Sequence, residues 1–390
     1  MPFSAEALQV HTLASLPARV RTFRNIVVYP TQELLRHLSG GAFFRGGPDW
    51  PRFPTQIYAR HCWNLIPRPV DSRPYRAEPA SDRIERGIWC GPVSNHFGHM
   101  VADFGMRIAL SSRLDPVTPL VFSIAPDAPE PPAFFRQILD HLGVDQRRIL
   151  LVRHPTRFGE LLVAPQAERR FGGRPARRHL RMMDALTSNR PPPVCPSAER
   201  VFVSRGRWPK GRFAAESYLD EVFAAAGVTV FHPETVDLHT QLRVYRGAHT
   251  LIFSEGSALH ALQLLGHVDA DVAVLARRPG KQIAASSLRP RVRSLRYIPA
   301  ARGVIYGVSR SGRAQLPAGI SVLDESACIN GLRALGVDLG GIWEPHRHAE
   351  SRDAEIAAWI AYRLATATHP GERQMIEQRL RAVSLPHLIP

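Results

Sequence analysis

Three polar residues spaced four apart are the first part of the chain whose types and positions could do chemistry. Asn95, His99 and Asp103 recur at i, i+4 and i+8, so a helix over residues 96–110 would project all three from one side. The same helix would carry a separate apolar face, made of Phe97, Met100, Val101, Phe104 and Ile108. The polar trio is therefore expected to face something other than the core.

Three interpretations of this trio stay open. In the first, Asp103 takes a proton from an attacking hydroxyl, and His99 orients it or shares its charge. In the second, His96, His99 and Asp103 ligate a metal ion, since all three lie near one side of the helix. In the third, the histidine and the aspartate only satisfy each other's hydrogen bonds. The residue types favour the catalytic and structural interpretations equally, and both over a metal site.

A second candidate site is the turn of Glu255, Gly256 and Ser257. A β-branched and aromatic run over residues 250–254 predicts a strand, and a helix over 257–265 starts directly after it. Gly256 would let a ligand approach the backbone, and the amino end of the helix favours negative charge. A phosphate or diphosphate is the expected ligand, although a glycine needed only for steric reasons explains the turn equally well.

The elements around this turn alternate between strand and helix. Strands are predicted over residues 201–204, 228–232, 250–254 and 271–276, with helices over 212–226, 238–245 and 257–265. This spacing predicts right-handed crossovers and a parallel sheet, with ligands at the carboxyl ends of its strands.

The first half of the chain also has an α/β pattern, so we expect two domains. An α/β domain over residues 1–190 carries the trio, a proline-rich linker covers 191–200, and a Rossmann-like domain covers 201–345. Residues 346–390 are expected to form helices that pack back on the first domain. Candidate polar sites on both domains favour an enzyme with a cleft over a single-site binder.

The net charge of +16 over 390 residues predicts an acidic partner such as a nucleotide, a polyanionic sugar, a lipid surface or a nucleic acid. The arginines are scattered and no nucleic-acid-binding signature accompanies them, so specific nucleic-acid recognition is disfavoured. A solvated basic surface explains the charge equally well.

No apolar run is long enough to span a bilayer, and the amino terminus lacks the order of a signal peptide. The four cysteines lie far apart, which disfavours a disulfide framework or a cysteine zinc site. We expect a cytoplasmic protein whose last helix could touch the inner face of a membrane.

The residues around the trio resemble a known family. Gly91-Pro92 followed by Asn95, His99 and Asp103 is similar to the N-x-x-x-H-x-x-x-D signature of glycosyltransferase family 61, also called the DUF563 family. The resemblance implies that Asp103 is the catalytic base, with His99 beside it.

Two later stretches resemble motifs of the same family. Val203-Ser204-Arg205 with Arg212 and Glu216 is similar to the S-R motif and the R and N-E residues that follow it, and residues 254–259 stand where the family often has P-H-G-A-A-L. The order and rough spacing hold over residues 88–276. The three motifs together are much more specific than any one.

Two departures affect the expected donor contacts. Glu255 replaces the family's usual histidine, and Ala215 replaces the asparagine before Glu216. They indicate a bacterial capsule-type branch or a changed sugar preference. Glu255 could hold a ribose or sugar hydroxyl instead.

The resemblance implies a GT-B architecture, in which two Rossmann-like domains face each other across a cleft. It also implies an inverting, metal-independent transfer of a sugar from a nucleotide donor, which we expect to be UDP-linked, to a glycan or lipid-linked glycan acceptor in surface polysaccharide assembly. No further cofactor is expected. The implied donor-binding residues are Arg205, Lys210, Arg212, Glu216, Glu255, Gly256, Ser257 and Ala258.

The main alternative is a non-catalytic protein of the same fold that holds a nucleotide or an acidic glycan for a partner. Such a protein would have no turnover for Asp103→Asn to remove. A third possibility, binding to nucleic acid or a membrane surface through the positive charge, predicts an affinity that falls steeply with salt.

Overall fold

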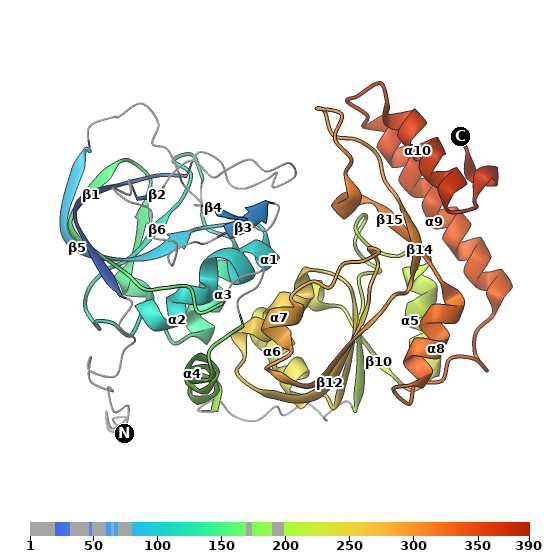
Figure 1. Ribbon diagram of the computed structural model, residues 1–390, viewed down its shortest axis with the longest axis horizontal. Helices are drawn as coiled ribbons and strands as arrows, with labels where there is room; N and C mark the ends of the chain where they lie inside the picture. The colour runs from blue at the N-terminus through green and yellow to red at the C-terminus, as the bar shows by residue number, and fades with distance from the viewer. Residues whose placement is uncertain are drawn as a thin grey trace.

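The structure is a computed structural model, and it describes residues 20–31, 47–48, 60–63, 66–68, 80–128, 130–168, 174–188 and 199–390. These residues form a mixed α/β fold whose two main sheets are rich in parallel pairs (Figure 1). The proline-rich linker expected over residues 191–200 lies outside the described residues, except for its last two positions.

The first sheet has six strands in the order β2-β1-β8-β5-β6-β7. Its strands are β1 (Arg21–Tyr29), β2 (Gly47–Pro48), β5 (Asp82–Pro92), β6 (Leu120–Ser123), β7 (Ile149–Val152) and β8 (Thr156–Val163). β5 pairs in parallel with β8 and β6, whereas β1 runs antiparallel to β8. Neighbouring residues of β5 face different clusters, Ile88 one and Trp89 the other, so both faces of the sheet are covered.

Shorter elements accompany this sheet. They are the antiparallel pair β3 (Arg60–Trp63) and β4 (Ile66–Arg68), the helices α3 (Ala133–His141) and α4 (Arg177–Ser188), and the 3₁₀ turn η4 (Gln146–Arg148).

The second sheet is entirely parallel, in the order β10-β9-β11-β12-β13, as the alternating pattern predicted. Its strands are β9 (Arg200–Val203), β10 (Thr229–Phe231), β11 (Thr250–Ser254), β12 (Val268–Leu275) and β13 (Val292–Ile298). The helices that accompany it are α5 (Glu216–Ala225), α6 (Leu238–Gly247), α7 (Ala285–Leu288) and α8 (Glu325–Arg333), with the 3₁₀ turn η5 (Pro233–Thr235). β10 lies on one side of β9 and β11 on the other, so the loops after β9 and β11 diverge at a topological switch point, where such sheets bind ligands.

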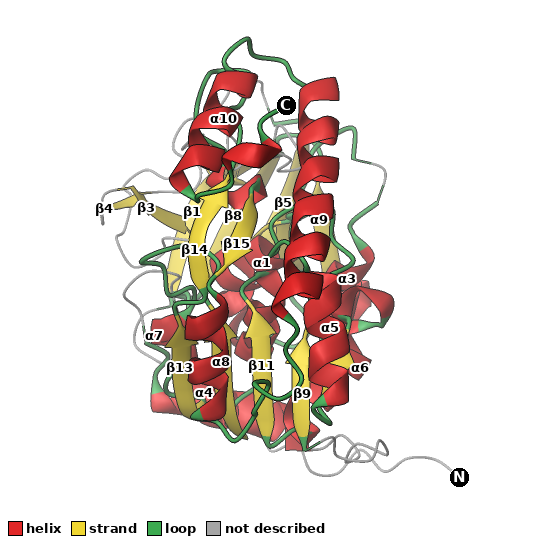
Figure 2. Ribbon diagram, turned by 90° about the vertical axis from the view of Figure 1, so that its right-hand side faces the viewer, coloured by secondary structure: helices red, strands yellow, loops and turns green. Residues whose placement is uncertain are grey.

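The last part of the chain packs on the second half of the molecule (Figure 2). The antiparallel pair β14 (Ala301–Ile305) and β15 (Ile320–Leu323) is covered by α9 (Pro345–Ala365) and α10 (Glu372–Ala382), with the 3₁₀ turns η7 (Leu316–Ala318) and η8 (Pro386–Leu388) nearby. Ile356 and Ile360 of α9 contact the cluster of Ile305 and Val322. The expected packing of these helices on the first domain is therefore not what the structure shows, because their apolar stripe covers the β14–β15 pair instead.

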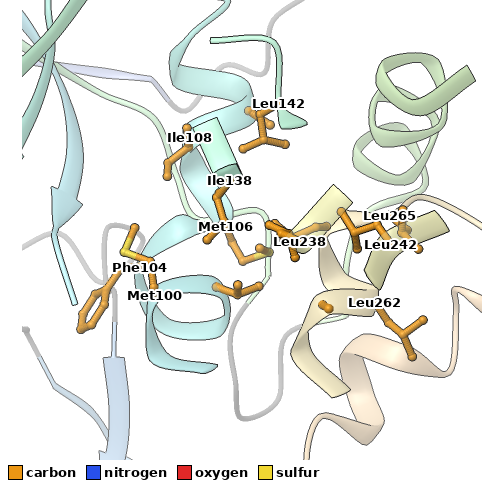
Figure 3. Close-up of a cluster of buried hydrophobic side chains, with 14 of the residues drawn as sticks. Met100, Phe104, Met106, Ile108, Ile138, Leu142, Leu238, Leu242, Leu262 and Leu265 are labelled. Atoms are coloured by element: carbon orange, nitrogen blue, oxygen red, sulfur yellow. The ribbon is translucent and has the colours of Figure 1, made fainter. Parts of the chain in front are cut away.

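The two halves of the molecule share one hydrophobic core (Figure 3). Phe104 and Ile108 of the first half lie in the same cluster as Leu242 and Leu262 of the second. A hydrogen bond of 2.8 Å between Nε2 of His141 and the carbonyl oxygen of Leu264 also joins them. The helices that carry the two candidate sites are thus packed against each other. Within the described part of the chain, no helix is long and apolar enough to cross a membrane.

Candidate functional site

The first candidate site lies on an irregular helical segment that follows β5. The segment runs through α1 (Phe97–His99), the π turn η2 (Met100–Phe104), the 3₁₀ turn η3 (Gly105–Arg107) and α2 (Ile108–Ser111). His96 caps it, since its side chain accepts a hydrogen bond from the backbone N–H of His99. A helical segment was predicted here, but not the π turn, a feature frequent at functional sites.

Asn95 does not lie on this helix. It is exposed and precedes the cap, because His96 rather than Asn95 takes the capping position. The predicted trio on one face is therefore reduced to His99 and Asp103.

His99 and Asp103 form a close pair. Nδ1 of His99 lies 2.5 Å from Oδ2 of Asp103, and their side chains are 14% and 1% exposed. An ionised carboxylate only accepts hydrogen bonds, and a proton on Nδ1 of His99 would leave Nε2 as the basic atom of the ring. The more exposed histidine is thus the better placed of the two to take a proton, and the buried aspartate to orient it.

The metal interpretation finds no support in the donor set. Among the residues that the structure describes, no group of three or more histidine, cysteine, aspartate or glutamate side chains is arranged to hold a metal ion.

The second candidate site is built by the loops at the switch point. After β9, the backbone N–H of Arg205 donates to Oε1 of Glu216 at 2.7 Å, and that of Phe213 donates to Oε2 at 2.9 Å. Glu216 is buried, and burial raises the pKa of its carboxyl group. Both of its carboxylate oxygens thus bind backbone N–H groups of the loop that presents Arg205.

Arg205 lies directly over Gly256. A β carbon built on Gly256 would stand 2.2 Å from Nη1 of Arg205, so a side chain at this position would displace the guanidinium group. Nε of Arg205 donates to the carbonyl oxygen of Gly211 at 2.8 Å, which fixes the side chain across the switch point. The structure thus brings the Arg205 loop and the Gly256 turn together.

Glu255 holds the turn after β12. Its buried carboxylate accepts hydrogen bonds from the backbone N–H groups of Arg277 at 2.9 Å and Arg278 at 3.2 Å, and from Nε of Arg278 at 2.7 Å. The sequence suggested that Glu255 could hold a ribose or sugar hydroxyl, and in the structure its carboxylate positions two arginines.

Arg277 was not among the donor-binding residues that were predicted from the sequence. It is 4% exposed, and burial lowers the pKa of its guanidinium group to about 9. Within the described residues, its Nη1 has no hydrogen-bond partner. Nη2 of Arg277 and Nη2 of Arg205 each lie 3.5 Å from the β-carbon position of Gly211, so two guanidinium groups converge beside the switch point. The signal that could have found it is its place directly after a third parallel strand.

Two predicted donor residues lie elsewhere. Lys210 is exposed on the loop, and no contact of its side chain is described. Arg212 donates to Glu355 of α9 and to the carbonyl oxygen of Phe213. Arg212 therefore anchors the C-terminal helix instead of facing the edge of the sheet.

Ser257 and Ala258 begin the 3₁₀ helix η6 (Ser257–Leu264), and this helix brings the two sites together. A β carbon built on Gly98 would stand 3.1 Å from the Cβ of Ser257 and 3.0 Å from Cδ2 of His260. The helix of the His99–Asp103 pair thus packs at close range on the helix that leaves the Gly256 turn.

The stretch of chain that carries both candidate sites matches a known protein family. Residues 97–266 match the family model of Glycosyltransferase 61. The Glycosyltransferase 61 match runs from α1 to the end of η6, so it includes the His99–Asp103 pair, Arg205 and Gly256. Asn95 and Arg277 lie outside it. A glycosyltransferase has a sugar donor and an acceptor, and two adjoining sites suit that requirement. No curated protein matches the chain.

Proposed function

We propose that this protein is an inverting, metal-independent glycosyltransferase of GT-B architecture. It moves a sugar from a UDP-linked donor to a glycan or lipid-linked glycan in the cytoplasm, during assembly of a surface polysaccharide. The observation that carries the proposal is the packing of Gly98 against Ser257, since it joins an acid–base pair to an anion-ready turn. The Glycosyltransferase 61 match over residues 97–266 supports the reaction class.

The His99–Asp103 pair supplies the base that inversion needs. As the acceptor hydroxyl attacks the anomeric carbon, Nε2 of His99 takes its proton. Asp103 holds the ring in the required tautomer and stabilises the imidazolium that forms, through the 2.5 Å contact to Nδ1. This exchanges the roles that the sequence suggested, because Asp103 is the buried member of the pair.

The leaving diphosphate gains negative charge as the glycosidic bond breaks. Arg205 and Arg277 are positioned to bind it, and both are held before a ligand arrives, by Glu216 and Glu255 respectively. Fixed guanidinium groups in a buried setting stabilise developing charge without reorganising at the moment of reaction. The start of η6 at Ser257 and Ala258 adds backbone N–H groups at the same edge.

The test begins with nucleotide binding. Melting temperatures are measured with UDP, GDP, CDP and CMP, each with and without EDTA, because a ligand selective for the native state raises the melting temperature. We expect UDP to raise it and EDTA to leave the rise unchanged. Release of UDP from UDP-sugars in the presence of glycan acceptors then measures transfer.

Each outcome has a distinct meaning. If no nucleotide raises the melting temperature, the proposed donor site does not bind nucleotides and the proposal is wrong. If a nucleotide binds but no donor and acceptor pair gives turnover, the non-catalytic binding protein is the better description. If the rise in melting temperature disappears with EDTA, metal-independent binding is wrong.

A further inference from the structure

Trp208 is an exposed tryptophan on the loop that follows β9. It is 45% exposed, and Val236, on the loop that follows β10, is 36% exposed. Because β9 and β10 are parallel neighbours, both loops leave the same edge of the sheet. Two exposed apolar side chains at the edge where such sheets bind ligands indicate a surface for a ligand with an apolar face.

The loop that carries Trp208 is held by backbone hydrogen bonds. The N–H of Trp208 donates to the carbonyl oxygen of Arg205 at 2.9 Å, and the N–H of Gly211 donates to the carbonyl oxygen of Gly319 at 3.0 Å. Glu216 accepts the N–H of Arg205 at 2.7 Å. The indole ring is thus presented to solvent on a fixed backbone, which lowers the entropic cost of binding a ligand.

The Trp208 ring lies close to the cation proposed to bind the diphosphate. Cζ of Arg205 is 6.0 Å from the centre of the ring. In a nucleoside diphosphate, the ribose stands between the base and the diphosphate. A flat aromatic surface at this distance from the guanidinium group therefore suits the base, since every nucleobase has a π face that stacks on aromatic side chains.

The loops after β9 and β10 contact each other through Asp220 of α5. A β carbon built on Gly206 would stand 2.9 Å from Oδ2 of Asp220, and the same oxygen lies 3.5 Å from Nε2 of His232. Gly206 belongs to the loop of Trp208, and His232 begins the loop of Glu234. The tryptophan and the glutamate therefore come from adjoining loops.

Glu234 gives this part of the edge a carboxylate. Its side chain is 20% exposed, and Nδ1 of His232 lies 3.8 Å from its Oε1, which is too long for a hydrogen bond. Burial lowers the pKa of Arg205, and the charges of Glu216 and Glu234 oppose that effect, so Glu234 lies within electrostatic range of Arg205. In sheets of this kind, a carboxylate after the second strand is placed to accept hydrogen bonds from ribose hydroxyls.

We propose that the loops after β9 and β10 bind the nucleoside end of the donor, with the base stacked on Trp208 and the ribose hydroxyls donating to Glu234. The inference rests on the proposed transferase function. It also orients the donor along the edge of the sheet, because the diphosphate then lies between Arg205 and Gly256, at β9 and β11. The sugar extends towards His99, whose helix packs on η6.

The first test separates the two ends of the donor by titration calorimetry with UDP and with inorganic pyrophosphate. Trp208→Ala should raise the Kd for UDP roughly tenfold, the usual loss for one base–aromatic stack. It should leave the Kd for pyrophosphate unchanged, because Arg205 remains in place. Tyr362→Ala is the matched control, since Tyr362 is an exposed aromatic residue of α9, and its Kd for UDP should equal that of the wild type.

The second test concerns the ribose and uses UDP together with a UDP analogue that lacks both ribose hydroxyls. Glu234→Ala should raise the Kd for UDP about tenfold, because hydroxyl groups lose a charged acceptor. It should not change the Kd for the analogue. Glu350→Ala is the control, since Glu350 is an exposed carboxylate of α9, and it should bind both ligands like the wild type.

The outcomes distinguish this inference from the proposed function. Wild-type affinity for UDP in either Trp208→Ala or Glu234→Ala would overturn the inference and leave the proposed function intact. If the KM for the glycan acceptor rose instead, the loops would belong to the acceptor. Equal losses for UDP and pyrophosphate in Trp208→Ala would also overturn the inference, because the effect would then act through Arg205. A wild type that does not bind UDP would overturn the proposed function and the inference with it.

Discussion

Nδ1 of His99 lies 2.5 Å from Oδ2 of Asp103, and the aspartate is the buried member of the pair. In the proposed mechanism, Asp103 orients the imidazole and His99 transfers the proton. Asp103→Asn tests whether the pair takes part in catalysis, because an asparagine can offer its NH₂ group to Nδ1 and stabilise the wrong tautomer. We expect kcat to fall by roughly 10²–10⁴-fold, the usual contribution of general acid–base catalysis. The UDP-induced rise in melting temperature should stay unchanged, and a variant within threefold of wild-type kcat would exclude the pair from catalysis.

Arg277→Met tests whether Arg277 binds the diphosphate, and a second arginine, Arg212, supplies the matched control. A hydrogen bond to a charged group contributes about 1.5–3 kcal/mol, so the Kd for UDP should rise about 10–100-fold. Arg212→Met is the control, since Arg212 is bound to Glu355 on α9. It should lower the melting temperature without changing the Kd for UDP, measured by titration calorimetry. Equal Kd values for wild type and Arg277→Met would remove Arg277 from the site.

Gly256→Ala should disturb nucleotide binding without unfolding the protein. The new methyl group would stand 2.2 Å from Nη1 of Arg205, so the flexible end of that side chain must move away from the switch point. We expect UDP binding to weaken at least tenfold. Gly341→Ala is the control, since a β carbon there meets no atom within 4 Å. Wild-type UDP affinity in Gly256→Ala would show that the placement of Arg205 over this glycine does not matter for the donor.

Asp220 predicts a pH dependence of stability. Burial raises the pKa of its carboxyl group to about 6, from an ordinary value of 3.8. Between these pH values the folded chain binds more protons than the unfolded chain, so this contribution to stability is present at low pH and is lost as pH rises through about 6. Asp220→Asn removes the cost of ionisation, so its melting temperature should exceed that of wild type at about pH 8, with a gap that narrows towards about pH 4.5.

Asp353 is a control, because its pKa is shifted in the opposite direction and its effect on stability should have the opposite pH dependence. Burial opposes its ionisation, but Arg352 and His387 outweigh burial and hold the pKa of Asp353 below its ordinary value. Its contribution to stability is present at neutral pH and lost as pH falls. Asp353→Asn should therefore lower the melting temperature at about pH 8 and lose this effect in acid. Parallel pH profiles for the two variants would contradict at least one of the two assignments.

Part of the site followed from spacing. The contact between His99 and Asp103 could be predicted because residues four apart meet on any helix, and the N-terminal position of Ser257 followed from a strand running directly into a helix. The same spacing argument was wrong for Asn95, because the cap of the helix lies one residue later, at His96. Helix boundaries depend on a few hydrogen bonds, and spacing alone does not locate them.

The partners of the charged residues could not be predicted. Arg212 and Arg277 are alike in sequence, yet one binds α9 and the other enters the switch point. Glu255 stands in a recognisable motif, but its carboxylate is used by two arginines that follow a different strand. Charge has no periodicity, so only the folded chain assigns each pair.

By itself, the sequence determined that the second half forms a parallel sheet with helices between its strands, because strand and helix periods are local properties of the chain. Only the tertiary structure decided that α9 and α10 cover β14 and β15, that Arg277 joins Arg205, and that Gly98 meets Ser257 and His260. Each of these contacts joins residues far apart along the chain. They arise from which apolar faces bury each other and which strand ends share an edge, and no local pattern records either.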